Sequence, residues 1–185
     1  MARVIRETDR MRLWLLRHAK SSWDDPGVED RDRPLAPRGE QAADRMRDYI
    51  ATADIRPDLV LCSSALRTRQ TLARILPALG PELKVWIDPS LYTFDASGLL
   101  KRLQAIPDVV GSSMLIGHNP AMQELAIMLA ASGDGSGRLT QKYPTGALAE
   151  IEFPTGSWHE VGTTPGELTR FVVPRELRRD PHDRD

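Results

Sequence analysis

Four short runs of apolar residues in the first two thirds of the chain have the length of β-strands. They are RLWLL at 12–16, LVLC at 59–62, LKVWI at 83–87 and SMLIG at 113–117. Their apolar residues do not alternate with polar ones, which is typical of strands that are buried on both faces of a sheet. Each run precedes a segment with helical spacing, so the pattern predicts repeated strand–helix units.

Helical periodicity fills the segments between these strands. Apolar residues recur at three- and four-residue spacing after Arg38, over 66–79 and over 99–106. A fourth helix is predicted to begin at Pro120, a residue that the first turn of a helix tolerates, and to run to about Ala131. This order of elements predicts an α/β three-layer sandwich, with a mostly parallel sheet flanked by helices.

The pattern changes after Ser132. SGDGSGR at 132–138 predicts a flexible loop, and GALAEIEF (146–153) and GELTRFVV (166–173) predict two further strands joined by a hairpin-like excursion. We expect a single domain over residues 1–174. The tail over 175–185 mixes charges and has almost no apolar residue, so we expect it to be disordered.

Composition and charge exclude several classes of protein. The 25 Lys and Arg residues balance 26 Asp and Glu residues, which argues against a dedicated binder of nucleic acid or of a membrane surface. Cys62 is the single cysteine, so no internal disulfide can form. The first residues lack the apolar stretch of a signal peptide, and no apolar run is long enough to span a bilayer. We therefore expect a soluble, cytoplasmic protein.

Polar residues cluster where three of the predicted strands end. Arg17 and His18 follow the first strand, Arg67 lies shortly after the second, and His118 follows the fourth. The carboxyl ends of parallel strands lie at one edge of a sheet, where ligands usually bind, so these side chains are expected to converge.

The residue types at these strand ends favour an anion over a metal ion. Guanidinium groups offer paired donors to phosphate or carboxylate, and a neutral imidazole can act as a nucleophile toward phosphorus. Arginines are poor neighbours for a metal cation, and Cys62 is the only cysteine or acidic residue at these ends. The sequence therefore predicts a phosphate pocket with neither a metal nor a cofactor.

Three short motifs at these strand ends resemble those of the histidine phosphatase superfamily, which has the phosphoglycerate mutase-like fold. LLRHAKSSW resembles its Arg-His-Gly signature with Ala19 in place of the glycine, CSSALRTRQT resembles its Ser-x-x-x-Arg-x-x-Gln-Thr motif, and GHNP resembles its third motif. The resemblance extends from Met11 to about Ala131. The opening RHAKSSWDD and the segment DRDRPLAPRG are most similar to the small SixA-type branch, which is associated with phosphohistidine phosphatases.

The resemblance implies roles for individual residues. His18 would be the nucleophile that becomes phosphorylated, and Arg17 and Arg67 would bind the phosphoryl oxygens. His118 would complete the pocket as a donor to the transferred group. Further substrate contacts are expected from Ser21 and Asn119.

The sequence departs from mutase-like members at two positions that bear on the substrate. Asp24 stands where they carry a phosphate-contacting Asn, and Thr93 lies near the position of their acidic proton donor. Asp95, two residues on, is a candidate donor, with Asp24 and Asp25 as further alternatives. A phosphorylated imidazole leaves more readily than an alkoxide, so it depends less on a general acid. The missing donor therefore favours a phosphohistidine substrate, and Asp24 favours a phosphatase over a mutase.

We therefore expect a metal-independent phosphatase that acts through a phosphohistidine intermediate at His18 on a phosphorylated protein. One alternative is a small-molecule phosphomonoesterase acting on a small phosphate ester, such as a sugar or nucleotide phosphate. Another is a non-catalytic module that binds phosphorylated ligands without turning them over.

Several neighbouring residues have structural interpretations. Ser63 and Ser64 are predicted to cap the helix that follows them, Cys62 to be buried in its strand, and Arg69 to be a solvated helix residue. The charged segment DRDRPL at 30–35 predicts Asp–Arg pairs that hold the loop after the first strand, with Arg33 or Arg38 as less favoured substrate contacts.

Overall fold

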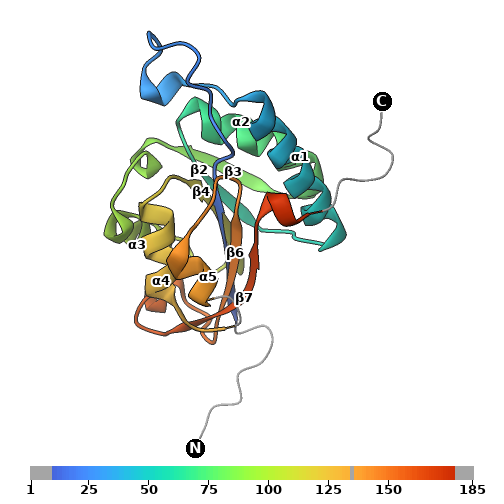
Figure 1. Ribbon diagram of the computed structural model, residues 1–185. Helices are drawn as coiled ribbons and strands as arrows, with labels where there is room; N and C mark the ends of the chain where they lie inside the picture. The colour runs from blue at the N-terminus through green and yellow to red at the C-terminus, as the bar shows by residue number, and fades with distance from the viewer. Residues whose placement is uncertain (1–9, 134–135, 178–185) are drawn as a thin grey trace, which may run out of the picture.

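The chain folds into three layers, in which one seven-stranded sheet lies between two groups of helices (Figure 1). The computed structural model describes residues 10–133 and 136–177. The order of the strands across the sheet is β3-β2-β4-β1-β6-β7-β5. The strands are β1 (Met11–Arg17), β2 (Leu59–Ser63), β3 (Lys84–Asp88), β4 (Ser112–Gly117), β5 (Ala130–Ser132), β6 (Leu148–Phe153) and β7 (Gly166–Val172).

Helices cover both faces of the sheet, and Figure 1 shows α1 and α2 on one side and α3 and α4 on the other. In the described part of the chain, no helix is both long and apolar enough to span a membrane. The α-helices are α1 (Pro37–Thr52), α2 (Leu66–Ile75), α3 (Ala96–Gln104), α4 (Ala121–Leu129) and α5 (Ser136–Gln141). The short 3-10 helices are η2 (Asp30–Asp32), η3 (Leu76–Ala78), η4 (Pro89–Leu91), η5 (Trp158–Glu160) and η6 (Pro174–Glu176).

The sheet is mostly parallel, as the sequence predicts. Four of its six strand pairings are parallel, and β6 is antiparallel to both β1 and β7. In the centre, Arg17 of β1 lies opposite Gly117 of β4, and Cys62 of β2 lies opposite Ile116. This register brings the carboxyl ends of β1, β4 and β2 to the same edge of the sheet.

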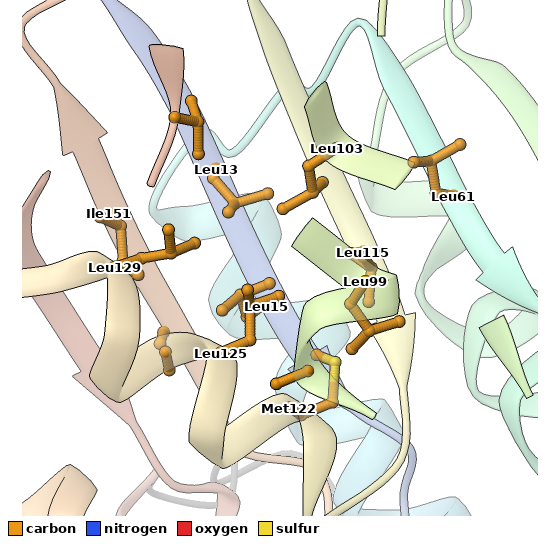
Figure 2. Packing of buried hydrophobic residues seen from close by; sticks show 14 of the residues in the cluster. Leu13, Leu15, Leu61, Leu99, Leu103, Leu115, Met122, Leu125, Leu129 and Ile151 are labelled. Atoms are coloured by element: carbon orange, nitrogen blue, oxygen red, sulfur yellow. The ribbon is translucent and has the colours of Figure 1, made fainter. Parts of the chain in front are cut away.

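Successive residues of β1 supply both cores of the sandwich. Leu13 and Leu15 point to the face that α3 and α4 cover, where Leu99 and Leu125 pack close to them (Figure 2). Trp14 and Leu16 belong to a second cluster, on the face that α1 and α2 cover. The unalternated apolar strand therefore reflects burial on both faces, which fixes the position of the strand end that carries the polar residues.

Strand β3 differs from its prediction because it is an edge strand. Its residues are exposed or half-buried, among them the apolar side chains of Val85, Trp86 and Ile87. A run of apolar residues does not by itself distinguish a central strand from an edge strand, since strand order depends on contacts between distant segments.

Two predictions for the last third of the chain also differ from the structure. The sequence predicts a loop over 132–138, but α5 begins at Ser136 and the preceding β5 pairs with β7. The expected disordered tail begins at residue 175, whereas η6 continues to Glu176 and Leu177 packs against the core. Residues 178–185 of that tail lie outside the described residues.

Candidate active site

A cavity of about 470 Å³ opens at the carboxyl edge of the sheet. It brings together residues from the ends of β1 and β4, the start of α2 and the loops between them. Of the predicted site residues, those that line it are Arg17, His18, Ser21, Arg67, His118 and Asn119.

A larger cavity of about 700 Å³ lies at the opposite, amino-terminal end of β1 and β4. Its three arginines are paired with aspartate or glutamate side chains. The described lining of this larger cavity contains no histidine, whereas the smaller cavity has His18 and His118 beside Arg17, which forms no ion pair with the described residues. The smaller cavity therefore has the better chemistry for a phosphorylated ligand.

His18 is held in one tautomer directly after β1. Its Nδ1 is 2.7 Å from the carbonyl oxygen of Ala19, and because a carbonyl oxygen only accepts, Nδ1 is the nitrogen that carries the proton. Burial is the main cause that lowers the pKa of His18, to about 3, and the nearby His118, Arg67 and Arg17 lower it further. His18 is therefore neutral near pH 7, with a lone pair on Nε2.

His118 follows β4 and faces His18 at a distance of 5.1 Å between ring centroids. Its Nε2 is 2.8 Å from Oγ of Ser63, and its buried Nδ1 has no hydrogen-bond partner among the described residues. Burial, followed by the charge of Arg67, lowers the pKa of His118 to about 4. The ring is thus neutral as well, and Nδ1 is the nitrogen left for a ligand.

Neither Ser63 nor Ser64 caps α2, although the sequence predicts this role for both. Helix α2 has Ala65 as its N-cap, without a side-chain hydrogen bond. The fully buried hydroxyl of Ser63 contacts His118, and Oγ of Ser64 accepts from Arg31 at 2.9 Å. A serine just before a helix is ordinarily predicted to be its N-cap. The contact of Ser63 with His118 depends on the pairing of β2 with β4, which the position of the serine in the sequence does not reveal.

The two arginines approach the histidines from different elements, and each is anchored by the protein. Arg17 donates from Nη1 to the carbonyl oxygen of Tyr143 at 2.7 Å, and its buried Nε has no partner among the described residues. Arg67, in the first turn of α2, donates from Nη2 to Oδ2 of Asp30 at 2.9 Å. These bonds hold two guanidinium groups beside His18 without using all their donors.

Asp30 connects several parts of the site. Besides Arg67, its carboxylate accepts from Nη1 of Arg33 at 3.1 Å and from the hydroxyl of Tyr92 at 2.7 Å. The bond from Tyr92, followed by those from Arg67, lowers the pKa of Asp30. The predicted Asp–Arg pairs in the 30–35 segment are confirmed. Asp30 and Tyr92 were not predicted to line the site, because their contacts join segments that are distant in sequence.

Asp95, the candidate proton donor, lies elsewhere. Its carboxylate caps α3 by accepting from the backbone N–H groups of Ser97 and Gly98, and it is exposed outside the cavity. The side-chain and backbone bonds from Ser97 lower the pKa of Asp95, so it is ionised at neutral pH and has no proton to donate. Its role is that of a helix cap.

The remaining predicted residues have clear surroundings. Ser21 Oγ accepts from Arg33 at 3.2 Å, and Asn119 has a buried Oδ1 without a partner among the described residues. Cys62 is buried as predicted, and burial raises the pKa of its thiol to about 12, which excludes a thiolate nucleophile. Arg69 is exposed. No group of three His, Cys, Asp or Glu side chains suited to a metal ion occurs in the described ranges.

Known proteins with these features identify the family. The family model of the histidine phosphatase superfamily (branch 1) matches residues 13–100, which contain the first two motifs. The solved structure of the proposed phosphohistidine phosphatase SixA from Agrobacterium tumefaciens is 31% identical, with a TM-score of 0.73 over 89% of this chain and 99% of that one. The chain belongs to the histidine phosphatase superfamily.

One further solved structure agrees with membership of the histidine phosphatase superfamily, and one further relative matches most of the chain. The proposed phosphohistidine phosphatase SixA from Nakamurella multipartitia is 26% identical, with a TM-score of 0.77 over 89% of this chain and 96% of that one. An uncharacterized protein of Mycobacterium leprae is 34% identical over 166 residues, which are 86% of this chain and 100% of its own. His118 lies beyond the residues that the family model matches, and the fold brings it to His18.

Proposed function

We propose that this member of the superfamily is a phosphohydrolase that forms a phosphohistidine intermediate at His18, with phosphohistidine on a protein as its substrate. The observation that carries the proposal is the fixed tautomer of His18. A neutral imidazole with its proton on Nδ1 has a nucleophilic Nε2, and it lies in a cavity with Arg17, Arg67 and His118.

In the first step, Nε2 of His18 attacks the phosphorus of the substrate. A bond forms between Nε2 and phosphorus, and the bond between phosphorus and the substrate nitrogen breaks with its electron pair on that nitrogen. The carbonyl oxygen of Ala19 continues to accept from Nδ1 and favours the positive charge that develops on the ring. Arg17 and Arg67 donate to the equatorial phosphoryl oxygens.

The acidic side chain at the cavity favours this substrate over an alkyl phosphate. Of the described residues that line the cavity, Asp30 alone is acidic, and its three donors and lowered pKa keep it ionised. A phosphorylated imidazole can take a proton from water on its second nitrogen, since the pKa of imidazole is about 6.5, and then leaves as a neutral ring. An alkoxide has no such route.

In the second step, water attacks the phosphoryl group on His18. The bond between phosphorus and Nε2 breaks, its electron pair returns to Nε2, and the protons of the water remain with inorganic phosphate and solvent. The same donors stabilise the charge in both steps, because both pass through a trigonal phosphoryl group.

Activity assays on two histidine variants test the function. His18→Ala should lower kcat for a phosphohistidine peptide by at least about a thousandfold, since it removes the nucleophile. His159→Ala is the matched control, because His159 is exposed and outside the cavity, and it should keep wild-type turnover. Undiminished turnover in His18→Ala would contradict the proposal.

The substrate class is tested with the wild-type protein alone. We expect kcat/KM to be higher for phosphohistidine peptides than for sugar and nucleotide phosphates, and to be unaffected by a metal chelator. A preference of about a hundredfold for alkyl phosphates, which is about 2.7 kcal/mol of differential transition-state binding, would instead indicate a small-molecule phosphatase.

A further inference from the structure

Three aromatic side chains line the same cavity as His18, and the proposed mechanism places none of their rings against the substrate. They are Trp23, Tyr92 and Phe94, which we call the aromatic rim. Trp23 is 72% exposed and Phe94 is 58% exposed. Large apolar side chains that cluster, exposed to solvent, beside a polar cavity are characteristic of a contact surface for a ligand or partner.

Trp23 is held at the cavity although most of it is exposed. The guanidinium carbon of Arg33 lies 3.1 Å from the centroid of its ring, so one face of the indole is covered by a cation. Arg33 is itself only 5% exposed, and it donates to the carbonyl oxygen of Ser22, to Ser21 and to Asp30. These hydrogen bonds fix the guanidinium group of Arg33, and the indole of Trp23 stacks on that group. The other face of the indole ring remains exposed.

Tyr92 is held through the same carboxylate, and Phe94 lies beside Tyr92. The hydroxyl of Tyr92 donates to Asp30 at 2.7 Å, and its ring lies 5.3 Å from His118 and 6.5 Å from Phe94 between centroids. Asp30 therefore fixes Tyr92 directly, and it fixes Trp23 through Arg33. The aromatic rim is a prearranged set of rings around the base of the cavity, where Arg17 and Arg67 lie beside His18. We call this base the floor.

We propose that the aromatic rim binds the imidazole ring of the phosphorylated histidine while its phosphoryl group occupies the floor. This inference rests on the proposed function, because the position of the phosphoryl group comes from it. The histidine ring is bonded directly to phosphorus. A phosphoryl group placed between His18, Arg17 and Arg67 therefore puts that ring at the cavity wall, where the aromatic rim lies.

The chemistry of the aromatic rim matches a flat ring better than a sugar. Aromatic faces stack on a planar heterocycle, whereas a sugar needs hydrogen-bond partners for its hydroxyl groups. Phe94 offers no such partner, the hydroxyl proton of Tyr92 is already donated to Asp30, and Trp23 offers a single N–H donor. The aromatic rim thus selects for the leaving group, while the floor selects for phosphate.

Binding measurements with two probes separate the aromatic rim from the floor. The first probe is a peptide with a phosphoryl-triazole side chain, which keeps a planar ring next to phosphorus and resists hydrolysis, and the second is inorganic phosphate. The ratio of the peptide Kd to the phosphate Kd should rise about tenfold in Trp23→Ala and in Phe94→Ala, as expected for the loss of one stacked ring. Trp23→Phe retains a ring and should keep the ratio within about threefold of wild type.

The matched control is Trp86→Ala. Trp86 is also exposed and also lies under an arginine, Arg102 at 5.4 Å, but it is on the edge strand β3 outside the cavity. The ratio of the peptide Kd to the phosphate Kd in Trp86→Ala should equal that of wild type. Wild-type ratios in both Trp23→Ala and Phe94→Ala, or the same rise in Trp86→Ala, would overturn the assignment.

The two proposals fail in different ways in this experiment. Binding requires no turnover, so a rim-dependent ratio in a protein that hydrolyses no phosphohistidine peptide would contradict the proposed function and support the aromatic rim. Turnover of the peptide without any rim-dependent ratio would support the function and overturn the assignment of the aromatic rim. Binding of inorganic phosphate by each variant shows that its floor is intact.

Discussion

The buried hydroxyl group of Ser63 contacts the ring of His118. Oγ of Ser63 lies 2.8 Å from Nε2 of the ring, and His118 can use only its other nitrogen toward a ligand. If Ser63 donates, Nε2 accepts and Nδ1 carries the proton that a phosphoryl oxygen needs. If Nε2 donated instead, the lone pair of Nδ1 would repel that oxygen. Ser63 is thus expected to act as a positioning residue that sets the tautomer of His118.

Ser63→Ala tests this assignment at the residue scale. We expect kcat to fall by about ten- to a hundredfold, because His118 is free to adopt the wrong tautomer. Nitrogen NMR of the His118 ring should report a proton on Nδ1 in the wild type and a shift toward Nε2–H in the variant. Ser64→Ala, the adjacent control, should change neither quantity. A wild-type tautomer and kcat in Ser63→Ala would rule the role out.

The residues that sequence could identify are those whose chemistry is unusual at a strand end. Arg17, His18, Arg67 and His118 fit a motif that can be recognised without a structure. The contacts of Ser63 could not be predicted in this way, because a serine before a helix is ordinarily a cap. Asp30, Tyr92 and Trp23 act through contacts between distant loops, and no local pattern reports such contacts.

At the scale of elements, the start of α1 holds the loop that follows β1. The backbone N–H of Ala36 donates to the carbonyl oxygen of Lys20 at 2.9 Å, which brings the helix against the loop that carries His18 and Ser21. A Cβ atom at Gly39 would lie 2.0 Å from that same oxygen. Only glycine allows this approach, so the APRG segment fixes the geometry of the site from outside it.

Gly39→Ala should therefore destabilise the protein and disturb the site together. We expect the free energy of unfolding in urea to fall by about 1–3 kcal/mol, as for overpacked positions, with a lower kcat/KM because the loop after β1 must shift. Gly137 in α5 is the control, since a Cβ there meets nothing within 4 Å. Gly137→Ala should leave stability equal or raise it by up to about 1 kcal/mol. Equal stability of Gly39→Ala and the wild type would contradict the close packing.

Sequence predicts the existence of most elements better than their place in the sheet. The runs that became β1, β2 and β4 were recognised by continuous apolar residues, which burial on both faces requires. The same pattern led to a wrong prediction of burial for β3, whose position at the edge follows from long-range pairing. The short α5 was missed because its glycine-rich start is typical of a loop.

For the whole molecule, strand order is what turns separate motifs into one site. Strand β4 inserts between β2 and β1, so residues that are about 50 and 100 positions apart reach the same edge of the sheet. Successive apolar side chains of these strands pack alternately into the two hydrophobic cores, which holds the strands in register. The resulting cavity presents fixed donors around His18, which is the arrangement that a transferred phosphoryl group requires.

Trapping the covalent intermediate tests the phosphohistidine mechanism directly. The protein is mixed with a phosphohistidine peptide that carries a radioactive phosphoryl group, quenched within the first turnover in alkali, and digested for mass spectrometry. We expect a phosphoryl group on Nε2 of His18 that is stable in alkali and labile in acid, and no such label in His18→Ala. Turnover of the peptide with the label on another residue, or with no label on His18 at any quench time, would contradict this mechanism.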